Sequence, residues 1–454
     1  MKKFITEPER NVEIIHETDV LVVGSGPGGL SAALAAARTG VKVALVERFG
    51  CFGGNITVVG VEGFAWYRHE KTNEAGGIAH EFEERAKAIG AAVPESQSIS
   101  YDLDSERFKL VADKLVQEAN IHPMLHRLFV SPIIEENTIK GIIVESKSGR
   151  EAIMSKRIID ATGDADIASR CGVPLRKTLV EEMMAASVMF HLSGVDKKAF
   201  MKEVKDNPQT YSDWTDGEWE IETSGKEDKM FSPFLKDPFK KAINAGIIKS
   251  DLNTISGTWG AMHDTGELTY MNLVHLTKCD GTNADSLTHF EIEGRKQAMQ
   301  AIEALRRYAP GCSNARLRNF GMTIGIRDTR KIDAIYNLTE ENVRGQAKFE
   351  DSIGIFPEFI DGYGVLILPT TGRYMQIPYR SILPKKISNL LVVGRAIGGD
   401  KIAHASTRNM ACCVVTGQGG GIAAALSVKS GKPLNGVNMT NVQKELQTQN
   451  VRFS

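Results

Sequence analysis

The chain has 454 residues, with 55 Lys and Arg against 56 Asp and Glu, so its formal net charge is −1 at pH 7. This balance argues against a broad nucleic-acid footprint, which needs an excess of positive charge. The six cysteines are scattered and form no C-x-x-C pair. This scatter argues against a zinc site, an iron–sulfur cluster or a secreted disulfide framework. We therefore expect no metal site and a reducing, cytoplasmic location.

The first nineteen residues, MKKFITEPERNVEIIHETD, lack the apolar stretch of a signal peptide. The longest apolar tracts, near Val20 and Leu390, are interrupted by Gly, Arg and Asp. Neither reaches the run of about twenty apolar residues that a transmembrane helix needs. We expect no membrane span.

Residues 19–47, DVLVVGSGPGGLSAALAAARTGVKVALVE, contain two short apolar runs on either side of a small-residue segment. This pattern predicts a strand, a helix that ends at Gly40 and a second strand. Gly24, Gly26 and Gly29 form G-x-G-x-x-G directly after the first strand. The first glycine permits the tight turn, the second lets a pyrophosphate approach the backbone, and the third lets helix and strand pack closely.

Glu47 ends the second predicted strand. A carboxylate at that place accepts hydrogen bonds from ribose hydroxyls, and the N-terminus of the helix attracts phosphates with its positive dipole end. The stretch therefore predicts a dinucleotide site, although the motif alone does not choose between FAD and NAD.

The next elements form a predicted meander. Residues 105–120 have the spacing of an amphipathic helix, and residues 126–136, 139–147 and 150–164 have the pattern of strands. We expect these strands to be antiparallel and to return to the parallel sheet at positions 158–159.

The character of the chain changes between residues 180 and 369, where charged loops and three of the four tryptophans lie. Residues 207–229 are polar and predict a surface excursion, whereas 285–310 predict a helix capped by Ser286 and followed by Pro310. After residue 375 the buried-strand pattern returns, and LVVGRA at 391 is similar to LVVGSG at 21. The sheet is therefore expected to contain distant parts of the chain.

Three further segments carry a resemblance to a known family. They are ERFGCFGGNIT from position 47, RIIDATGDADIASRCG at 157–172 and NLLVVGRAIGGDKIAHASTRNMACCVVTGQGGGIAAAL at 389–426. Together with 325–343 and 375–396, they resemble the FAD-dependent oxidoreductase family of the glutathione-reductase-like, two-dinucleotide-binding superfamily, near fumarate-reductase-type flavoproteins. The resemblance covers most of the chain and is weakest over 190–260.

The resemblance implies an α/β fold, with a Rossmann-like FAD-binding domain (a parallel sheet with an antiparallel meander) and an inserted α+β substrate lobe. The expected division is 1–180 and 375–454 for the FAD-binding domain and 181–374 for the substrate lobe. The implied FAD contacts are Gly24, Ser25, Gly26, Pro27, Gly28, Gly29, Glu47, Arg48, Gly53, Gly54, Asn55, Thr57, Val130, Ala161, Thr162, Gly163, Asp164, Gly394, Arg395, Thr407 and Arg408.

In the C-terminal segment, Ser406 or Thr407 can cap a helix that runs through residues 411–415. Its N-terminus would supply partial positive charge to the pyrimidine end of the flavin and stabilise the anionic reduced form. The small residues of GQGGGIAAAL would also allow close contact with the first helix.

Four residues are predicted to be catalytic. Arg327 and Arg330 can bind a substrate carboxylate or steady flavin charge, or else form structural salt bridges with Asp328 or Glu340. His404 is a candidate general acid or base, and its alternative is a loop histidine bonded to the backbone. Arg408 is expected near the isoalloxazine. His263, His275, Arg373 and Tyr379 are predicted to meet the substrate, with structural packing as their alternative.

We expect a soluble FAD-dependent enzyme that transfers a hydride between flavin N5 and a small organic substrate. It would oxidise CH–OH or CH–CH, or reduce an activated double bond. Alternatives are a flavin monooxygenase and a flavin-bearing electron-transfer subunit of a larger complex. The expected partners are the substrate and an unidentified electron donor or acceptor, and the chain could form a homo-oligomer. The sequence contains no second G-x-G-x-x-G motif, so it predicts no separate nicotinamide-binding domain.

Overall fold

The computed structural model describes residues 3–64, 75–94, 101–209, 219–223, 234–252 and 255–454. The main sheet has the strand order β5-β2-β1-β8-β7-β6, and β21 pairs with β8 beside this path. Its strands are β1 (Glu13–Val23), β2 (Val43–Val46), β5 (His122–Met124), β6 (Leu128–Glu135), β7 (Thr138–Ser146), β8 (Gly149–Asp160) and β21 (Leu390–Val392).

Strand β8 joins the two parts of this sheet. Along its first half it is antiparallel to β7, and along its second half it is parallel to β21, with Ile158 opposite Leu390. Its other edge runs parallel to β1. The meander, its return to the parallel sheet and the contribution of a distant C-terminal strand are therefore confirmed.

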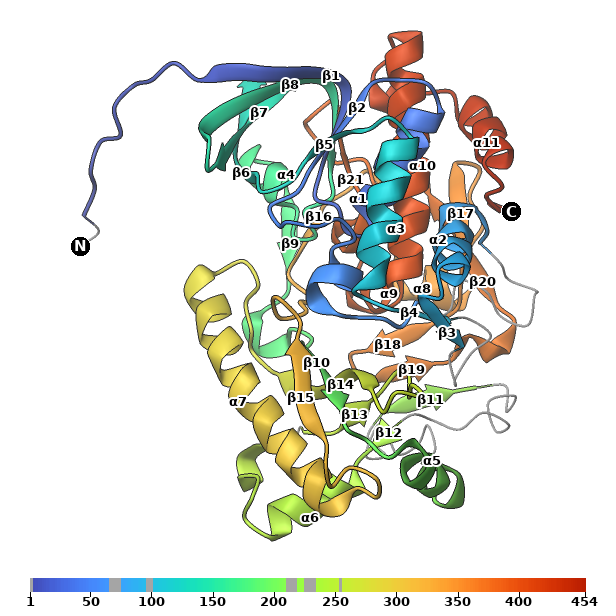
Figure 1. Ribbon diagram of the computed structural model, residues 1–454. Coiled ribbons are helices and arrows are strands. Elements are labelled where there is room, and N and C mark those ends of the chain that lie inside the picture. The colour runs from blue at the N-terminus through green and yellow to red at the C-terminus, as the bar shows by residue number, and fades with distance from the viewer. Residues whose placement is uncertain (1–2, 65–74, 95–100, 210–218, 224–233, 253–254) are drawn as a thin grey trace.

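Two helices far apart in the chain, α1 (Pro27–Arg38) and α10 (Met410–Ser430), pack side by side against this sheet (Figure 1). Their approach depends on glycine, because a Cβ on Gly417 would lie 2.0 Å from the carbonyl oxygen of Gly28. The hydroxyl of Ser31 also donates to the carbonyl of Val414 at 3.0 Å. The expected close contact of the two helices is confirmed.

Helix α10 is also the one described helix that is long and apolar enough to cross a membrane. In the structure, 89% of its apolar 18-residue window is buried inside the protein. Such burial is typical of a core helix. The sequence had not singled out this tract, because glycines and small residues make up much of it.

The second lobe is built on a sheet with the order β12-β13-β14-β10-β15, covered by the long helix α7 (Ala284–Tyr308). Its core is a separate apolar cluster that includes Phe190, Leu273 and Ala301. The remaining elements are β10 (Ala186–Ser193), β12 (Phe234–Leu235), β13 (Gly257–Thr258), β14 (Leu268–Leu276), β15 (Arg316–Phe320), α5 (Lys197–Asp206) and α6 (Asp237–Asn244).

The start of α7 differs from the prediction. The cap is Asn283, whose side chain accepts from the backbone N–H of Ser286, so Ser286 is the capped residue and not the cap. Either residue type can cap a helix, and the extended φ and ψ of Asn283 decide between them. Pro310 follows the end of the helix, as expected. Most of the predicted surface excursion, 207–229, lies outside the described residues.

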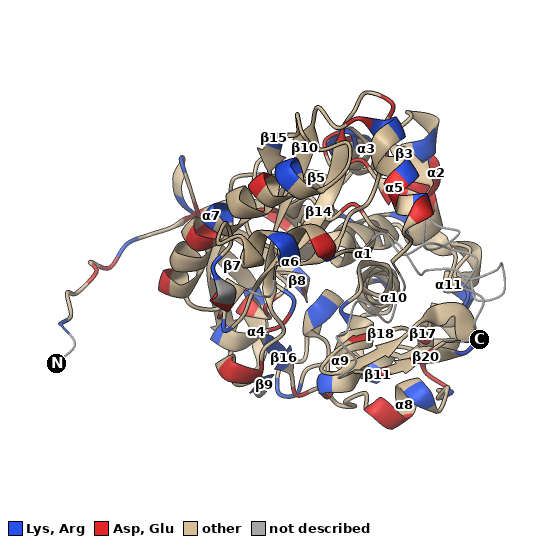
Figure 2. Ribbon diagram, turned by 90° about the horizontal axis from the view of Figure 1, so that it is seen from below, with Lys and Arg blue, Asp and Glu red and all other residues tan. Residues whose placement is uncertain are grey.

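Further strands and helices complete the structure. In the view of Figure 2, Lys and Arg alternate with Asp and Glu along the helices. The proposed division at residues 180 and 374 stays a prediction. These elements are β3 (Ala92–Pro94), β4 (Tyr101–Leu103), β9 (Leu175–Lys177), β11 (Glu220–Glu222), β16 (Arg330–Ile332), β17 (Ser352–Pro357), β18 (Ile360–Gly362), β19 (Val365–Ile367), β20 (Tyr374–Pro378), α2 (Gly77–Ala88), α3 (Arg107–Glu118), α4 (Asp166–Arg170), α8 (Glu340–Arg344), α9 (Lys401–Thr407) and α11 (Met439–Thr448).

Candidate active site and FAD-binding site

The glycine turn lies at the carboxyl end of β1, where α1 begins. A Cβ on Gly24 would lie 2.3 Å from the carbonyl oxygen of Ala161, and one on Gly29 would lie 1.8 Å from the carbonyl oxygen of Gly24. Both glycines are therefore required by packing. A Cβ on Gly26 would meet no atom within 4 Å, so the space over this residue is open. This is the place where a pyrophosphate needs close access to the backbone.

The N-terminus of α1 is free to bind an anion. Gly26 is its N-cap, Pro27 follows, no side chain caps the helix and no acidic residue lies in its first turn. The first N–H groups of a helix have no intrahelical partners and carry partial positive charge. An uncapped helix end beside open space fits a phosphate.

The carboxylate of Glu47 is fastened to the glycine turn. Its Oε2 accepts hydrogen bonds from the N–H and the hydroxyl of Ser25, at 2.8 and 2.7 Å, and its Oε1 accepts from the N–H of Phe49 at 3.0 Å. Glu47 is only 6% exposed. The neighbouring Arg48 is exposed and lies over the ring of Phe49. The contact of Glu47 with ribose stays a prediction.

The predicted flavin-side segment lies directly over the same turn. Gly54 has φ +51°, and a Cβ there would lie 2.4 Å from the Cα of Gly26. Gly53 donates its N–H to the carbonyl of Ser25 at 2.9 Å. A short π-helix, η1 (Asn55–Val59), follows, in which Thr57 donates to the carbonyl of Phe52. Asn55 reaches the sulfur of Met410 at 3.4 Å, which connects this segment to the start of α10.

Residues 161–164, which are predicted to contact FAD, form a turn after β8 that we call the second nucleotide turn. Asp160 accepts from the N–H and hydroxyl of Thr162, and burial raises the pKa of its carboxyl to about 6. Gly163 lies under the guanidinium of Arg395, whose Nη2 is 2.7 Å from Oδ1 of Asp164. The turn therefore connects β8 to the segment after β21. Of the other predicted contacts, Ala161 donates to the carbonyl of Val23, Gly394 donates to Thr416, and Val130 lies on β6, where its carbonyl accepts from Arg170.

The predicted cap in the C-terminal segment was wrong. Two helices meet there: α9 is capped by Asp400, and α10 has Asn409 as its N-cap residue. Ser406 and Thr407 form the end of α9, where they are almost fully buried. The chain turns at Arg408, so the helix N-terminus expected near the flavin begins at Met410.

Arg327 and Arg330 do not form a pair. Arg330 donates to the carbonyl of Asp164, the hydroxyl of Ser169 and the carboxylate of Asp166. Each nitrogen of its guanidinium group thus binds either the second nucleotide turn or the helix α4 that follows it. Its salt bridge is to Asp166, and the partners expected from the sequence, Asp328 and Glu340, bind other cations.

The arginine that lies near Arg327 is Arg408. Burial, and then the positive charge of Arg408, lower the pKa of Arg327 to about 10. Arg327 donates to the carbonyl of Ala185 and the side-chain oxygen of Asn272, both neutral acceptors. Arg408 donates to the carboxylate of Asp361 at 2.9 Å. Asp361 thus forms an ion pair with Arg408 and acts on Arg327 only through its charge.

His404 belongs to a buried network next to these arginines. Its Nε2 lies 3.0 Å from the carbonyl oxygen of Arg327 and 3.6 Å from Oδ1 of Asp328. Asp328 also accepts from Lys331, at 2.5 Å, and from the hydroxyl of Tyr363. Burial disfavours the Asp328 carboxylate, but Lys331 and the hydroxyl of Tyr363 favour it, and its pKa is lowered. Burial, then the charge of Lys331, lower the pKa of His404 to about 3.

The four predicted substrate-binding residues lie apart from one another. His275 faces the carbonyl of Ser256 at 3.0 Å, and burial followed by the charge of Arg327 lowers its pKa to about 4, so it is near the arginine pair. His263 lies in a turn before β14. Arg373 forms ion pairs with Glu358 and Glu222, and the buried Tyr379 donates to the carbonyl of Leu434. Among the described residues, no contact brings His263, Arg373 or Tyr379 together with His404 or Arg408.

A family model described as FAD dependent oxidoreductase matches residues 19–446. The chain belongs to this family. The protein is an FAD-dependent oxidoreductase, and its cofactor is FAD.

Curated relatives of this FAD-dependent oxidoreductase include thiamine thiazole synthases. That of Metallosphaera sedula is 32% identical over 165 residues, which cover 33% of this chain and 56% of the relative. That of Saccharolobus islandicus is 34% identical over 169 residues, which cover 34% of this chain and 58% of the relative. The chain thus spans little more than half the length of these relatives.

The fold of this FAD-dependent oxidoreductase is also found among solved structures. A geranylgeranyl bacteriochlorophyll reductase-like protein from Thermoplasma acidophilum aligns with a TM-score of 0.51 and 13% identity over 95% of this chain and 83% of that chain. At this identity the likeness shows the Rossmann-like α/β fold alone.

Buried polar atoms around the two arginines fit a bound FAD. Among the described residues, Nε of Arg395, Nε of Arg408, Nδ1 of His404 and Oγ of Ser406 are buried without a hydrogen-bond partner. Buried polar groups are nearly always paired in native proteins, so four such atoms around one helix junction indicate a bound polar group. The open space over Gly26 and the uncapped α1 meet the same requirement at the phosphate end.

The sequence did not identify Asp328, Lys331, Asp361 or Tyr363 as neighbours of His404 and Arg408, although it offered Asp328 as a salt-bridge partner of the two predicted arginines. The alternating charges of IRDTRK, in a buried segment, were the available signal for the first two. Asp361 and Tyr363 come from the β18–β19 hairpin, and only the fold brings them to α9.

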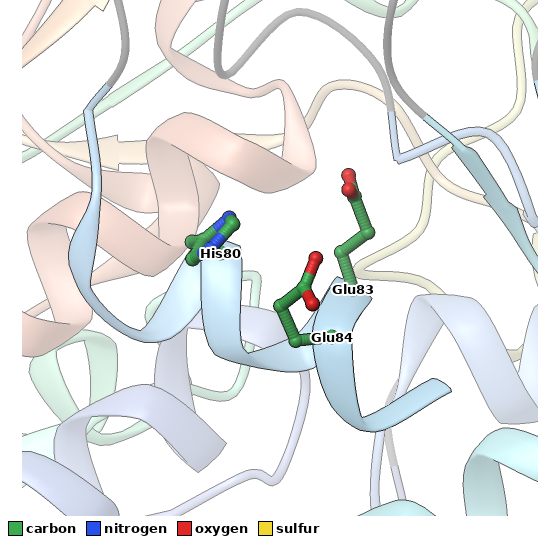
Figure 3. Close-up of side chains that lie close together, drawn as sticks. All are labelled: His80, Glu83 and Glu84. Atoms are coloured by element: carbon green, nitrogen blue, oxygen red, sulfur yellow. The ribbon is translucent and has the colours of Figure 1, made fainter. Parts of the chain in front are cut away.

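One group of metal-ligand types lies on α2, away from these residues. His80, Glu83 and Glu84 have potential ligand atoms within 4.8 Å of one another (Figure 3). Nζ of Lys87 lies 2.5 Å from Glu83 and 3.0 Å from Glu84. Both carboxylates already form ion pairs with this ammonium group, so we assign the group to the ion pairs of the helix surface.

Proposed function

We propose that this FAD-dependent oxidoreductase is a dehydrogenase or reductase for a small organic acid. When bound, FAD would supply or accept a hydride at N5, for oxidation of CH–OH or CH–CH or for reduction of an activated double bond. The observation that carries the proposal is the part-buried Arg327 and Arg408 next to His404, of which Arg408 forms an ion pair with Asp361 whereas Arg327 has only neutral acceptors among the described residues.

The arginine pair favours an anionic substrate. Because Asp361 balances one guanidinium, the other charge is uncompensated among the described residues, while Asp328 and Lys331 balance each other. A part-buried cation without a counterion is unfavourable, and a substrate carboxylate would neutralise it through charge-assisted hydrogen bonds. The planar guanidinium groups of Arg327 and Arg408 also suit carboxylate geometry.

His404 is placed to accept a proton. A carbonyl oxygen only accepts hydrogen bonds, so Nε2 of His404 carries a hydrogen that it donates to Arg327. With a pKa of about 3 the ring is neutral at pH 7, and Nδ1 then presents a lone pair with no partner among the described residues. Nδ1 would take the hydroxyl proton of a hydroxy acid, and Asp328 would stabilise the imidazolium that forms.

Anaerobic mixing of the FAD-loaded protein with a panel of substrates tests the proposal. Hydroxy acids or saturated acids should bleach the flavin absorption in one turnover, or enoates should reoxidise the reduced flavin. The matched controls are the corresponding amides and alcohols, which lack the carboxylate and should react about 100-fold more slowly. Neutral substrates that react equally well would contradict the proposal. Oxygen-dependent hydroxylation with a nicotinamide donor would favour a monooxygenase instead.

Two finer assignments belong to this proposal. The family pattern of the glycine turn, of the segment at 47–57 and of the C-terminal segment supports placement in the glutathione-reductase-like superfamily, near fumarate-reductase-type flavoproteins. The described cysteines are all free, which supports work in a reducing compartment such as the cytoplasm. The synthase activity named for the curated relatives is not carried over, because those matches cover only a third of this chain.

A further inference from the structure

His191 lies at an irregular point of the second-lobe sheet. Between the pairs made by Phe190 and Leu192 the register with β14 shifts, so that Thr269 and Tyr270 both lie opposite His191. The register with β15 shifts at the same place. Tyr270 takes a left-handed φ of +53° inside a strand. Bulges of this kind redirect side chains and are common next to active sites.

The imidazole of His191 has unused hydrogen-bonding capacity. The residue is 1% exposed, and neither ring nitrogen has a hydrogen-bond partner among the described residues. Burial lowers the pKa of His191 to about 4, so the ring is neutral at pH 7. A neutral imidazole offers one N–H and one lone pair, and leaving both unpaired in the interior is costly.

Glu62, from the FAD-binding lobe, is the acid that faces this ring. Its Oε1 lies 3.8 Å from Nδ1 of His191 and accepts the N–H and hydroxyl of Ser105, both at 3.0 Å. Glu62 is 3% exposed, and among the described residues no Lys or Arg forms an ion pair with it. Burial raises its pKa. The charged groups that act on the pair are Arg318, Asp104, Glu106 and Glu267.

The same pair adjoins the flavin-side segment. Gly60 ends η1 with φ +85°, and a Cβ there would lie 3.3 Å from Nε2 of His191. Val61 donates its N–H to the carbonyl of Asn55 at 3.1 Å, so the two residues before Glu62 fold back on the start of η1. The position of Glu62 therefore determines where the predicted flavin contact Asn55 lies.

We propose that Glu62 and His191 share one proton across the junction of the lobes at neutral pH, with Glu62 protonated and donating toward Nδ1 of His191, directly or through one water. This neutral contact holds η1 against the second-lobe sheet, which makes both residues positioning residues for the flavin. The ionised alternative would remove two charges from water without another counterion at Glu62. The assignment to the flavin rests on the proposed function, whereas the shared proton does not.

Infrared spectroscopy of the FAD-loaded protein at pH 7 tests the proton directly. The carboxylic acid C=O stretch of a protonated glutamic acid should be present in the wild-type protein and absent in Glu62→Gln. Glu83→Gln is the matched control, because Glu83 is similarly buried but forms an ion pair with Lys87, and the band should remain. If the spectrum of the wild-type protein minus that of Glu62→Gln lacks this band, the proposal is overturned. The infrared measurement needs no substrate. It can therefore disprove the shared proton while the proposed reaction holds, and the substrate panel can disprove the reaction while the shared proton holds.

The positioning role has a separate test. Glu62→Ala and His191→Ala should lower kcat about tenfold and change the fluorescence of the bound flavin. Glu62→Gln keeps a neutral donor, so it should restore kcat and should also lose the decline of kcat at high pH that ionisation of Glu62 causes. If Glu62→Gln is as impaired as Glu62→Ala, the carboxylate and not its proton is required. If both alanine variants keep kcat and flavin fluorescence, the positioning role is overturned.

Discussion

Oδ1 of Asp328 lies 3.6 Å from Nε2 of His404, and both side chains are almost completely buried. The same oxygen also holds Nζ of Lys331, at 2.5 Å. The carboxylate therefore faces both the ammonium group of Lys331 and a ring that is neutral at pH 7. Because Lys331 neutralises Asp328, the histidine gains little from the negative charge, and its pKa stays low at about 3.

Replacing Lys331 with methionine should raise the pKa of His404. The change removes a repelling charge and leaves Asp328 free to stabilise the imidazolium. NMR titration of the histidine signals, or the acid limb of kcat/KM against pH, should show the rise. Lys385→Met is the control, because Lys385 forms a similar 2.7 Å pair with Asp333 at the surface. An unchanged pKa in Lys331→Met would mean that burial alone controls His404. The variant should also lose about 3 kcal/mol of stability, because a buried carboxylate loses a partner.

The glycine turn offers a matched pair of substitutions. Gly26→Ala places a methyl group in open space, so the melting temperature of the apoprotein should be unchanged while FAD affinity falls by about 10- to 100-fold. Gly29→Ala drives the same methyl group into the carbonyl of Gly24, so the apoprotein itself should be destabilised. Calorimetry and FAD titration separate the two effects. Equal loss of stability in both variants would mean that the open space over Gly26 is not a ligand site.

Two arginines three residues apart should respond differently to the same change. Arg327→Met removes half of the proposed anion-binding pair, so KM for a carboxylate substrate should rise about 100-fold with FAD content unchanged. Arg330→Met removes three hydrogen bonds around the second nucleotide turn and should lower the melting temperature instead. Steady-state kinetics and thermal unfolding of both variants check this. A larger change of KM in Arg330→Met would reverse the assignment.

Acid should destabilise the protein through its buried histidines. The pKa of His275 is about 4 in the folded protein against an ordinary value of 6.5, so between these values the unfolded chain binds the additional proton. The free energy of unfolding therefore falls as the pH falls from 6.5 to 4, by about 3 kcal/mol for this residue.

Urea unfolding of His275→Gln at pH 7 and pH 4.5 measures that contribution. The variant should show a smaller loss of stability between the two pH values than the wild-type protein. His289→Gln, at an exposed position of α7, is the control and should behave like the wild-type protein. An equal pH dependence in all three proteins would contradict a buried, neutral His275.

The elements predicted best from the sequence are those whose cause is local. The G-x-G-x-x-G turn, the helix after it and the strand that delivers Glu47 depend on residues within thirty positions of one another, and all three are as expected. The helix caps were less predictable. Ser286 and Thr407 are good capping residues, but Asn283 and Asn409 lie close by and have the extended backbone that a cap needs.

The candidate active site could be predicted only in part, because its contacts join distant segments. His404 and Arg408 were identified from their place in the C-terminal segment. Their partners Asp328 and Asp361 are separated from them in the sequence by 76 and 47 positions (404 − 328 and 408 − 361). No local sequence pattern predicts contacts between residues so far apart in the chain. The choice of Arg330 as a partner for Arg327 followed from closeness in sequence, which the strand β16 overrides by turning the two side chains apart.

The packing of α1 against α10 has a consequence for synthesis of the protein. The bond from Ser31 to Val414 spans 383 positions, so ribosomes working at about 5 to 20 residues per second need roughly 20 to 80 s between the two. During that time the small-residue face of α1 has no permanent partner, and the nucleotide turn has no helix behind it. The nascent chain should therefore depend on chaperones until its last segment emerges, and truncation before residue 410 should leave aggregates and not a smaller flavoprotein.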